Sequence, residues 1–347
     1  MKAIKFLATA IAALAVLTRI AQADDVVRVG EGPFISAGAF FIAKDKGYFK
    51  KLGIDVETKT FADGAMAIPS IISGELDITN MPAAAGLFNA IAKGAPLVMF
   101  LDRGNNSPGK AYTTASVTQE VYDQGVHALA DFAKLKGMKV GVTAQGSINH
   151  YNMALALQKA GLDPVRDVQW VFGVAQPDLM KMLGQKQVDV ADLAYQFAFF
   201  ARSNHWSQIV ASGDQIEPGE QIATFAVRKD FLDKKRDVLV RWTAAYLQGV
   251  KEFNAAAAQP DQHPDVIDIL AKNTALQKPE LVKAIAPNWS YINPDGIPNV
   301  ASIMRMQDYW NSPAFHLVEK KIPQEQLFDL SVTKEAAQRL ARDKPFD

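Results

Sequence analysis

Apolar positions in the first third of the chain gather in short runs that alternate with longer stretches of helical periodicity. Four runs predict β-strands, at 26–30, 55–61, 77–80 and 96–101. The stretches between them predict helices, at 40–52, 65–73 and 83–93. Strands that alternate with helices of about ten residues are typical of a mostly parallel sheet with right-handed crossovers.

The same order of elements returns after the linker-like segment Arg103–Gly109. Strands are predicted at 139–143, 167–172, 188–191 and 208–212, and helices at 150–159, 177–184 and 195–202. Short strings also match, because Lys51–Ile54 resembles Lys159–Leu162 and Gly74–Ile78 resembles Lys186–Val190. Two copies of one βαβαβ unit predict two similar lobes, although turn and strand residues this common could also match by coincidence.

The last part of the chain has a different pattern. One strand is predicted at 221–227, followed by helices at 229–256, 264–272, 279–286, 298–311 and 333–342. The apolar faces of these helices need a partner, most simply the first lobe. We therefore expect an α/β fold in which the chain forms lobe one, then lobe two, and returns to lobe one with a helical C-terminal tail. The expected bounds are 24–104, 105–215 and 216–347, with hinge segments near 102–110 and 213–222.

Composition excludes several classes of protein. The 347 residues include no Cys, which removes thiol nucleophiles, Cys-ligated zinc and disulfides. Lys and Arg number 37 against 37 Asp and Glu, without the basic excess of a nucleic-acid binder. The 5 His residues are scattered without the spacing of a metal site, and no hydrolase, metalloprotease or nucleotide-binding motif occurs. We therefore predict a binding protein without metal or cofactor, and not an enzyme.

The first residues have the three parts of a secretory signal peptide. Lys2 and Lys5 precede an apolar run at 6–17, and the triplet AQA at 21–23 has the pattern of a cleavage site. The run is too short to cross a bilayer, and no later stretch reaches the roughly 18 apolar residues of a transmembrane helix. We therefore expect residues 1–23 to be a signal peptide and the mature protein to be exported and not membrane-inserted.

Candidate ligand-binding residues follow from the rule that open α/β sheets bind ligands beyond the carboxyl ends of their strands. The loop 143–150 carries the clearest signal, because Gly146 permits a tight turn and Ser147 can cap a helix whose amino end would bind an oxyanion. The loops of the first lobe contribute Phe34, Ser36, Gly64, Asn80 and Met81. Those of the second lobe contribute Gln145, Gly146, Ser147, Asn149, His150, Asp192 and Tyr195.

Several of these residues also have a purely structural interpretation. Ser147 could cap an ordinary helix, and His150 could be a hydrogen-bonded core histidine. Phe34 could fill the underside of its lobe instead of touching a ligand. Asp192 could contact a ligand amine or cap the helix that begins near Tyr195. The sequence leaves these alternatives open.

Three strings resemble a known family. Ala43–Val56 (AKDKGYFKKLGIDV) resembles a signature of periplasmic substrate-binding proteins of the nitrate, sulfonate and taurine ABC importers, whose relatives bind thiamine-pyrimidine precursors. Ile71–Asp77 (IISGELD) resembles the second marker of that family, and Gly146–Tyr151 resembles the helix start of its second lobe. The resemblance implies a two-lobed type II periplasmic-binding-protein fold with a cleft that closes on its ligand.

The resemblance also implies partners and a ligand class. It implies a periplasmic monomer that captures a small organic anion, a sulfonate or carboxylate, for an ABC permease with its cytoplasmic ATPase. No Arg or Lys falls inside the predicted loops, which disfavours a strongly charged small anion such as nitrate. Phe34, Tyr195 and Trp289 would suit an uncharged pyrimidine or another aromatic ligand. A pyrimidine synthase of the same fold is the less favoured alternative, because its Cys-rich motif is absent.

Overall fold

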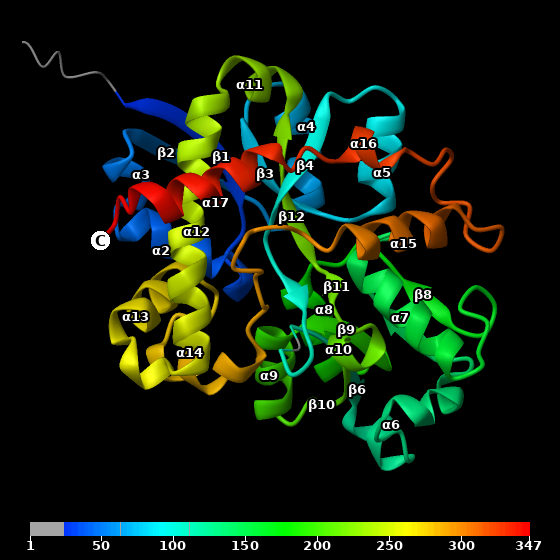
Figure 1. Ribbon diagram of the computed structural model, residues 1–347. Coiled ribbons are helices and arrows are strands. Elements are labelled where there is room, and N and C mark those ends of the chain that lie inside the picture. The colour runs from blue at the N-terminus through cyan, green and yellow to red at the C-terminus, as the bar shows by residue number, and fades with distance from the viewer. Residues whose placement is uncertain (1–23, 63, 111) are drawn as a thin grey trace, which may run out of the picture.

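The computed structural model describes residues 24–62, 64–110 and 112–347. The expected signal peptide, at 1–23, lies outside the described residues. Two five-stranded sheets form the framework. We call each sheet with its helices a lobe; lobe one occupies the upper part of Figure 1 and lobe two the lower right.

The sheet of lobe one has the strand order β2-β1-β3-β12-β4. The strands are β1 (Asp25–Glu31), β2 (Ile54–Thr60), β3 (Ile78–Pro82), β4 (Leu97–Asp102) and β12 (Ala223–Arg228). β1 pairs in parallel with both β2 and β3, whereas β12 is antiparallel to its neighbours β3 and β4. The predicted mostly parallel sheet is therefore confirmed, with the returning strand inserted in the opposite direction.

The sheet of lobe two repeats this arrangement in the order β8-β7-β9-β6-β10. Its strands are β6 (Thr113–Thr118), β7 (Lys139–Gly141), β8 (Gln169–Val171), β9 (Val190–Ala194) and β10 (Ser207–Ser212). β7 pairs in parallel with β8 and β9, and β6 lies antiparallel between β9 and β10. The same topology in both sheets confirms the internal repeat. The sequence prediction missed β6, because TTASVT is too polar to be recognised as a strand that is buried along its whole length.

Two short strands join where the chain passes between the lobes. β5 (Asn105–Asn106) on the first crossing pairs antiparallel with β11 (Glu220–Gln221) on the second. Gln221 also donates from Nε2 to Asp102 and to the carbonyl oxygen of Gly104, at 2.7 and 2.9 Å. The two crossings therefore form one hydrogen-bonded ribbon instead of two independent linkers.

Helices cover both sheets. Those that precede the first crossing are α2 (Gly38–Asp45), α3 (Tyr48–Lys51), α4 (Ile68–Ile72) and α5 (Ala85–Ala92). Those between the crossings are α6 (Gln119–Asp123), α7 (Ile148–Lys159), α8 (Gln176–Gly184), α9 (Tyr195–Ser203) and α10 (Gly213–Ile216). The tail contains α11 (Lys229–Lys234), α12 (Arg236–Ala258), α13 (Pro264–Asn273), α14 (Pro279–Ala284), α15 (Val300–Asn311), α16 (Gln324–Leu327) and α17 (Ser331–Asp343).

Two predicted helices are interrupted in the structure. The helix predicted at 40–52 ends at Asp45 and resumes as α3, because Gly47 adopts a left-handed conformation with φ of 74° that no helix can continue through. The helix predicted at 229–256 is divided at Lys235, which is not helical, into α11 and α12. None of the helices in the described ranges is both long enough and apolar enough to span a bilayer.

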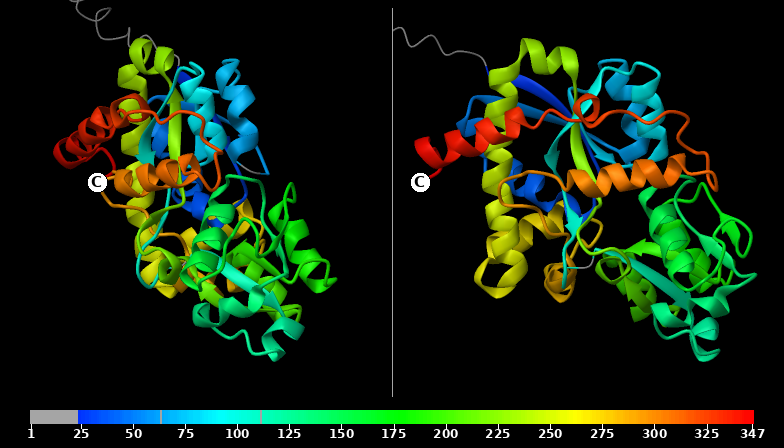
Figure 2. Two further views of the ribbon diagram at one scale, coloured as in Figure 1. Left: turned by 90° about the vertical axis from the view of Figure 1, so that its right-hand side faces the viewer. Right: turned by 45° about the vertical axis from the view of Figure 1, so that its right-hand side comes forward.

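The tail packs mainly on lobe one. Trp242 of α12 is fully buried, and its ring stacks on Phe49 at a centroid distance of 5.4 Å. Gly249 allows α12 to approach α2 closely, because a Cβ there would lie 2.2 Å from the carbonyl oxygen of Ala39. The helix α15 runs along the boundary between the lobes (Figure 2) and contacts β11.

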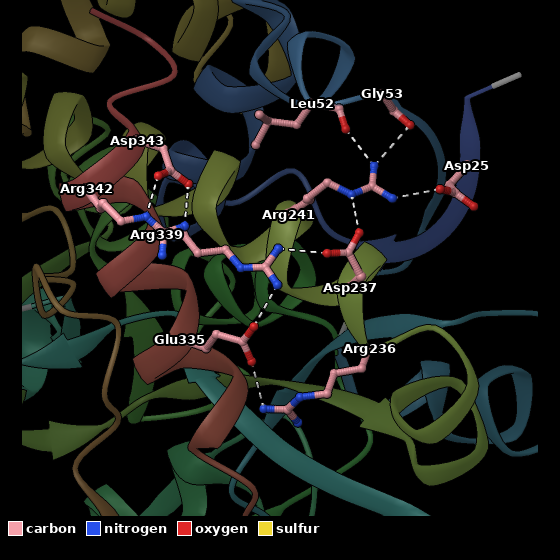
Figure 3. A network of polar contacts seen from close by, with 10 residues as sticks. All are labelled: Asp25, Leu52, Gly53, Arg236, Asp237, Arg241, Glu335, Arg339, Arg342 and Asp343. Carbon is pink, nitrogen blue, oxygen red and sulfur yellow. Dashed lines mark hydrogen bonds and ion pairs between the residues drawn. The ribbon is translucent and has the colours of Figure 1, made fainter. Parts of the chain in front are cut away.

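A chain of ion pairs fastens α17 and α12 to the first strand (Figure 3). Arg241 on α12 donates to Asp25 of β1 at 2.8 Å, and Asp237 one turn earlier accepts from Arg339 of α17 at 2.7 Å. Arg339 also donates to Glu335 at 2.7 Å. Since these side chains are partly exposed, each pair contributes at most about 1 kcal/mol to the free energy of unfolding. Their main effect is to fix where α17 lies against α12.

Candidate functional site

A cleft lies between the lobes, and together with the space open to solvent at its mouth it measures about 530 Å³. It lies beyond the carboxyl ends of the parallel strands β1, β3, β4 and β9, and beside the amino ends of the antiparallel strands β6 and β12. Its walls consist of Phe34, Ser36, Gly64, Asn80, Pro82, Arg103, Tyr112, Thr113, Ile148, Asn149, Gln176, Ala194, Ile222 and Ala223. Both lobes and both crossing segments therefore contribute to a single site, as the rule for open α/β sheets requires.

The floor of the cleft holds a buried ion pair. Arg103 donates from Nε and Nη2 to the Glu31 carboxylate, at 2.9 and 2.6 Å, and from Nη1 to Ser36 at 2.9 Å. The Arg103 and Glu31 side chains are only 3% and 0% exposed. Burial alone would lower the pKa of Arg103, but the Glu31 carboxylate outweighs it and raises that pKa above its usual value. Arg103 therefore keeps its charge, and the Glu31 carboxylate is its counter-ion.

Polar side chains from both lobes surround this pair. Asn80 of β3 is 7% exposed, and its Oδ1 accepts no hydrogen bond within the described part of the chain. The Thr113 hydroxyl accepts hydrogen bonds from the side-chain amides of Asn106 and Asn152, at 2.7 and 3.1 Å. Gln176 accepts from the Ala194 amide at 2.8 Å and so holds the end of β9 in place. Asn80 is therefore a hydrogen-bonding group still available to a ligand.

The amino end of α7 points its first residues at the cleft. Ser147 caps this helix by accepting from the His150 amide at 3.2 Å, and Gly146 before it is left-handed with φ of 73°. Ile148 and Asn149, the first two helical residues, line the cleft. The Asn149 side chain is fixed, because it accepts from Thr143 at 2.9 Å and donates to Asp192. The predicted capped helix start is thus confirmed, and its partial positive charge faces the cleft.

His150 is not a cleft residue. It is 2% exposed, its Nδ1 accepts from the Gly146 amide at 3.0 Å, and its ring stacks on Trp310 at 4.8 Å. Trp170 packs against the same ring edge-on at 4.4 Å. Burial lowers the pKa of His150 to about 3, so the imidazole is neutral. The structure therefore supports the alternative of a structural histidine that fixes the loop before α7.

The predicted residues fall into three groups. Phe34, Ser36, Gly64, Asn80 and Asn149 line the cleft. Met81, Gln145 and Ser147 line a neighbouring cavity. The remaining predicted residues, Gly146, His150, Asp192 and Tyr195, line neither.

Asp192 lies beneath the cleft. It is fully buried, and burial raises the pKa of its carboxyl well above the usual value, against the opposing effect of a hydrogen bond from Asn149. This carboxyl therefore acts through Asn149 and does not contact the cleft itself. Tyr195 is half-buried and packs against the apolar core.

Sequence reasoning missed the residues that the crossing segments supply. Arg103, Tyr112 and Thr113 flank the first crossing, and Ile222 and Ala223 end the second. The expectation that no basic side chain reaches the cleft is wrong, because Arg103 follows directly after β4. That position was a usable signal, since the residue after a buried strand lies at the ligand-binding edge.

The lobes touch each other at both ends of the cleft. The Ile35 amide in lobe one donates to Gln196 Oε1 in lobe two at 2.9 Å, and next to it the Phe34 and Phe197 rings meet edge-on at 6.3 Å. At the other end the Ala85 amide donates to the carbonyl oxygen of Gly146 at 3.0 Å. The structure is therefore a closed arrangement. Within the described ranges, no group of three or more His, Asp or Glu side chains could hold a metal ion.

Comparisons with known proteins agree with this architecture. A family model described as the NMT1-like family matches residues 21–271. A relative from Brucella abortus whose name describes it as a binding protein is 27% identical over 286 residues, which cover 81% of this chain and 82% of the relative.

Solved structures share the fold at low identity. The ligand-binding component of an ABC-type import system from Staphylococcus aureus has a TM-score of 0.72 at 15% identity, covering 90% of this chain and 99% of that chain. The periplasmic aliphatic sulphonate binding protein SsuA from Escherichia coli has a TM-score of 0.65 at 19% identity, covering 88% and 92%. At these identities the similarity shows the two-lobed fold alone.

Proposed function

This chain belongs to the NMT1-like family, and from that premise we propose that it is the solute-binding component of an ABC importer. In this role it captures a small organic anion between its lobes in the periplasm and presents it to a permease driven by a cytoplasmic ATPase. The name of the Brucella relative and the importer component among the structural neighbours support the role.

The observation that carries the proposal is a polar cleft whose walls come from two lobes joined by a hydrogen-bonded ribbon. A solute that touches Asn80 in lobe one and Asn149 in lobe two makes contacts that exist only when the lobes are together. Such differential contacts shift an open–closed equilibrium toward the closed form. The closed form then presents a surface built from both lobes.

An organic acid suits the donors in the cleft. The amino end of α7 favours a negatively charged group. Arg103 makes one hydrogen bond from each nitrogen, so Nη1 and Nη2 each carry a second N–H. Because Glu31 neutralises Arg103, the cleft carries little net positive charge. A sulfonate or carboxylate on an organic molecule, which gains further contacts from its organic part, is therefore favoured over a small inorganic anion.

An uncharged flat ligand, such as a pyrimidine, is the second candidate. The neutral Arg103–Glu31 pair favours it, because an uncharged solute needs no counter-charge when it leaves water. Phe34, whose ring lines the cleft, could stack on such a ligand.

Mass spectrometry of the protein isolated from the periplasm, under non-denaturing conditions, tests the proposal directly. We expect a small solute to copurify unchanged, and the protein refolded without it to be stabilised by that solute. At 100 times its Kd the solute should add about 2.7 kcal/mol. A panel of alkane- and arylsulfonates, taurine, carboxylates, nitrate and pyrimidines then separates the two ligand classes.

A pair of variants places the effect in the cleft. Asn80→Ala should weaken binding of a solute that offers a hydrogen-bond donor beside its acid group, because Oδ1 of Asn80 accepts no hydrogen bond within the described part of the chain. Asn204→Ala is the matched control, since Asn204 is exposed and its side chain donates to the Phe200 carbonyl oxygen at the end of α9. A protein that carries no solute and responds to no compound contradicts the proposal. A solute recovered in chemically altered form favours the enzyme alternative.

A further inference from the structure

A second chamber adjoins the polar cleft between the two lobes. Together with the space open to solvent at its mouth it measures about 800 Å³, and it shares the wall residues Pro82, Ile148 and Asn149 with the cleft. Lobe one contributes the segment after β3 and the start of α5, and lobe two contributes the loop before α7. The chamber therefore borders the cleft and, like it, has walls from both lobes.

The walls of this chamber differ chemically from those of the cleft. Ile68, Met81, Leu87 and Ile148 are apolar, and the polar side chains, Gln145, Ser147 and Asn149, all come from the loop before α7 and the first turn of that helix. No described residue that lines the chamber is charged, whereas the cleft contains the Arg103–Glu31 pair. A solute that reaches both spaces therefore meets hydrogen-bonding groups at one end and apolar surface at the other.

A glycine, Gly86, forms part of the chamber wall and is exposed. Gly86 lies in the first turn of α5, where glycine is less favourable than alanine by about 1 kcal/mol. A Cβ placed at Gly86 would meet no atom within 4 Å, so neighbouring groups do not require a glycine there. Ala84, which also lines the chamber, is small as well. Larger side chains at these two positions would reduce the space of the chamber.

We propose that this chamber binds the apolar part of the solute whose polar group occupies the cleft. The solute is then an amphipathic organic acid, with a chain or ring attached to its sulfonate or carboxylate, and not a compact polar molecule such as taurine. This inference rests on the proposed function, because it assumes that the cleft between the lobes is the solute site. It adds that Gly86 and the apolar walls select for the length of the solute.

The test uses one chemical series and three forms of the mature protein. Unbranched carboxylates and sulfonates of increasing chain length are titrated by calorimetry into wild type, Gly86→Leu and Gly86→Ala. The Leu variant fills the chamber, and the Ala variant adds the same helix-favouring effect with a single methyl group. Urea unfolding of all three forms checks that the variants fold, and we expect neither to be less stable than wild type.

In wild type, Kd should fall roughly three- to fourfold with each added methylene until the chamber is full. In Gly86→Leu the long members should lose at least about tenfold in affinity while the shortest keep theirs, and Gly86→Ala should behave like wild type. The inference is overturned if affinity does not depend on chain length, or if Gly86→Leu shows the same length dependence as wild type. Either result leaves the proposed function standing. If no member binds while a different solute copurifies, the inference is also overturned. If no solute of any class binds, the proposed function itself has failed.

Discussion

Replacing Glu31 by Gln tests whether one buried ion pair keeps the floor of the cleft electrically neutral. The Glu31 carboxylate accepts two hydrogen bonds from Arg103, at 2.9 and 2.6 Å, and both side chains are almost completely buried. Glutamine keeps the size of the side chain and removes its charge. The guanidinium of Arg103 would then stay buried without a counter-ion.

The expected magnitude follows from this geometry. Removing one partner of a buried ion pair costs about 3–5 kcal/mol. The lower end applies here, because Ser36 still accepts from Nη1 of Arg103 at 2.9 Å and the glutamine oxygen can accept one N–H. Glu31→Gln should therefore lower the free energy of unfolding by about 3 kcal/mol. Because the cleft becomes positively charged, an added organic sulfonate should recover part of this loss.

Urea unfolding at pH 7, followed by tryptophan fluorescence, measures the effect. Glu319→Gln is the matched control, because its partner Lys93 lies 3.0 Å away and both side chains are 66% exposed. Solvent screening limits that pair to less than about 1 kcal/mol. A loss in Glu31→Gln no larger than in the control would refute the reasoning. The double variant Glu31→Gln with Arg103→Met should regain stability, since it leaves no buried charge.

Three further predictions concern the loop before α7, the contact between the lobes and the helix packing. His150 has a pKa of about 3 when folded, below its ordinary 6.5, so its contribution to stability is complete above pH 6.5 and is lost as the pH falls toward 3. In urea unfolding between pH 6 and pH 4, the free energy of unfolding should change by about 1.4 kcal/mol less per pH unit in His150→Phe than in wild type. Equal slopes would contradict the burial argument. Gln196→Ala leaves the Ile35 backbone amide without its partner in the closed form, which costs about 1–3 kcal/mol. Solute affinity, measured by calorimetry, should therefore fall about fivefold or more. An unchanged Kd would show that this contact does not hold the lobes together. Gly249→Ala places a Cβ 2.2 Å from the Ala39 carbonyl oxygen. The resulting strain of about 1–3 kcal/mol should exceed the gain in helix propensity, so the free energy of unfolding should fall. A variant that is more stable in urea unfolding would disprove the close approach of α12 and α2.

Much of the fold was predictable because its signals are local. Alternating strands and helices indicated parallel sheets, and the matched strings indicated two copies of one unit, both of which the sheet topology confirms. The errors have equally local causes. Gly47 interrupts a continuous apolar pattern through its backbone conformation alone. The strand β6 is buried by elements from elsewhere in the chain, so its polar sequence gave no sign of burial.

The candidate site was less predictable, because its geometry depends on distant contacts. Phe34, Ser36 and Asn80 were identified, since loops after parallel strands lie at the ligand-binding edge. His150 was a candidate on the same reasoning, but Trp310 of the C-terminal tail stacks on its ring and encloses it. No pattern in the loop before α7 reveals a side chain that arrives from so far along the chain.

The position of Arg103 links the cleft to the hinge. It follows β4 directly and precedes β5, so the same short segment forms the cleft floor and begins the ribbon between the lobes. Its neighbour Asp102 accepts from the Gly104 amide, from Gln221 on the other crossing and from the Asn293 amide, at 2.8, 2.7 and 2.7 Å. Burial raises the pKa of Asp102 to about 6, although these hydrogen bonds oppose the rise. If the proposed function is correct, a solute that binds Arg103 contacts the first crossing segment directly, and the Asp102–Gln221 hydrogen bond connects that segment to the second crossing. Binding would then be coupled to closure through these two segments, without a further relay through either lobe.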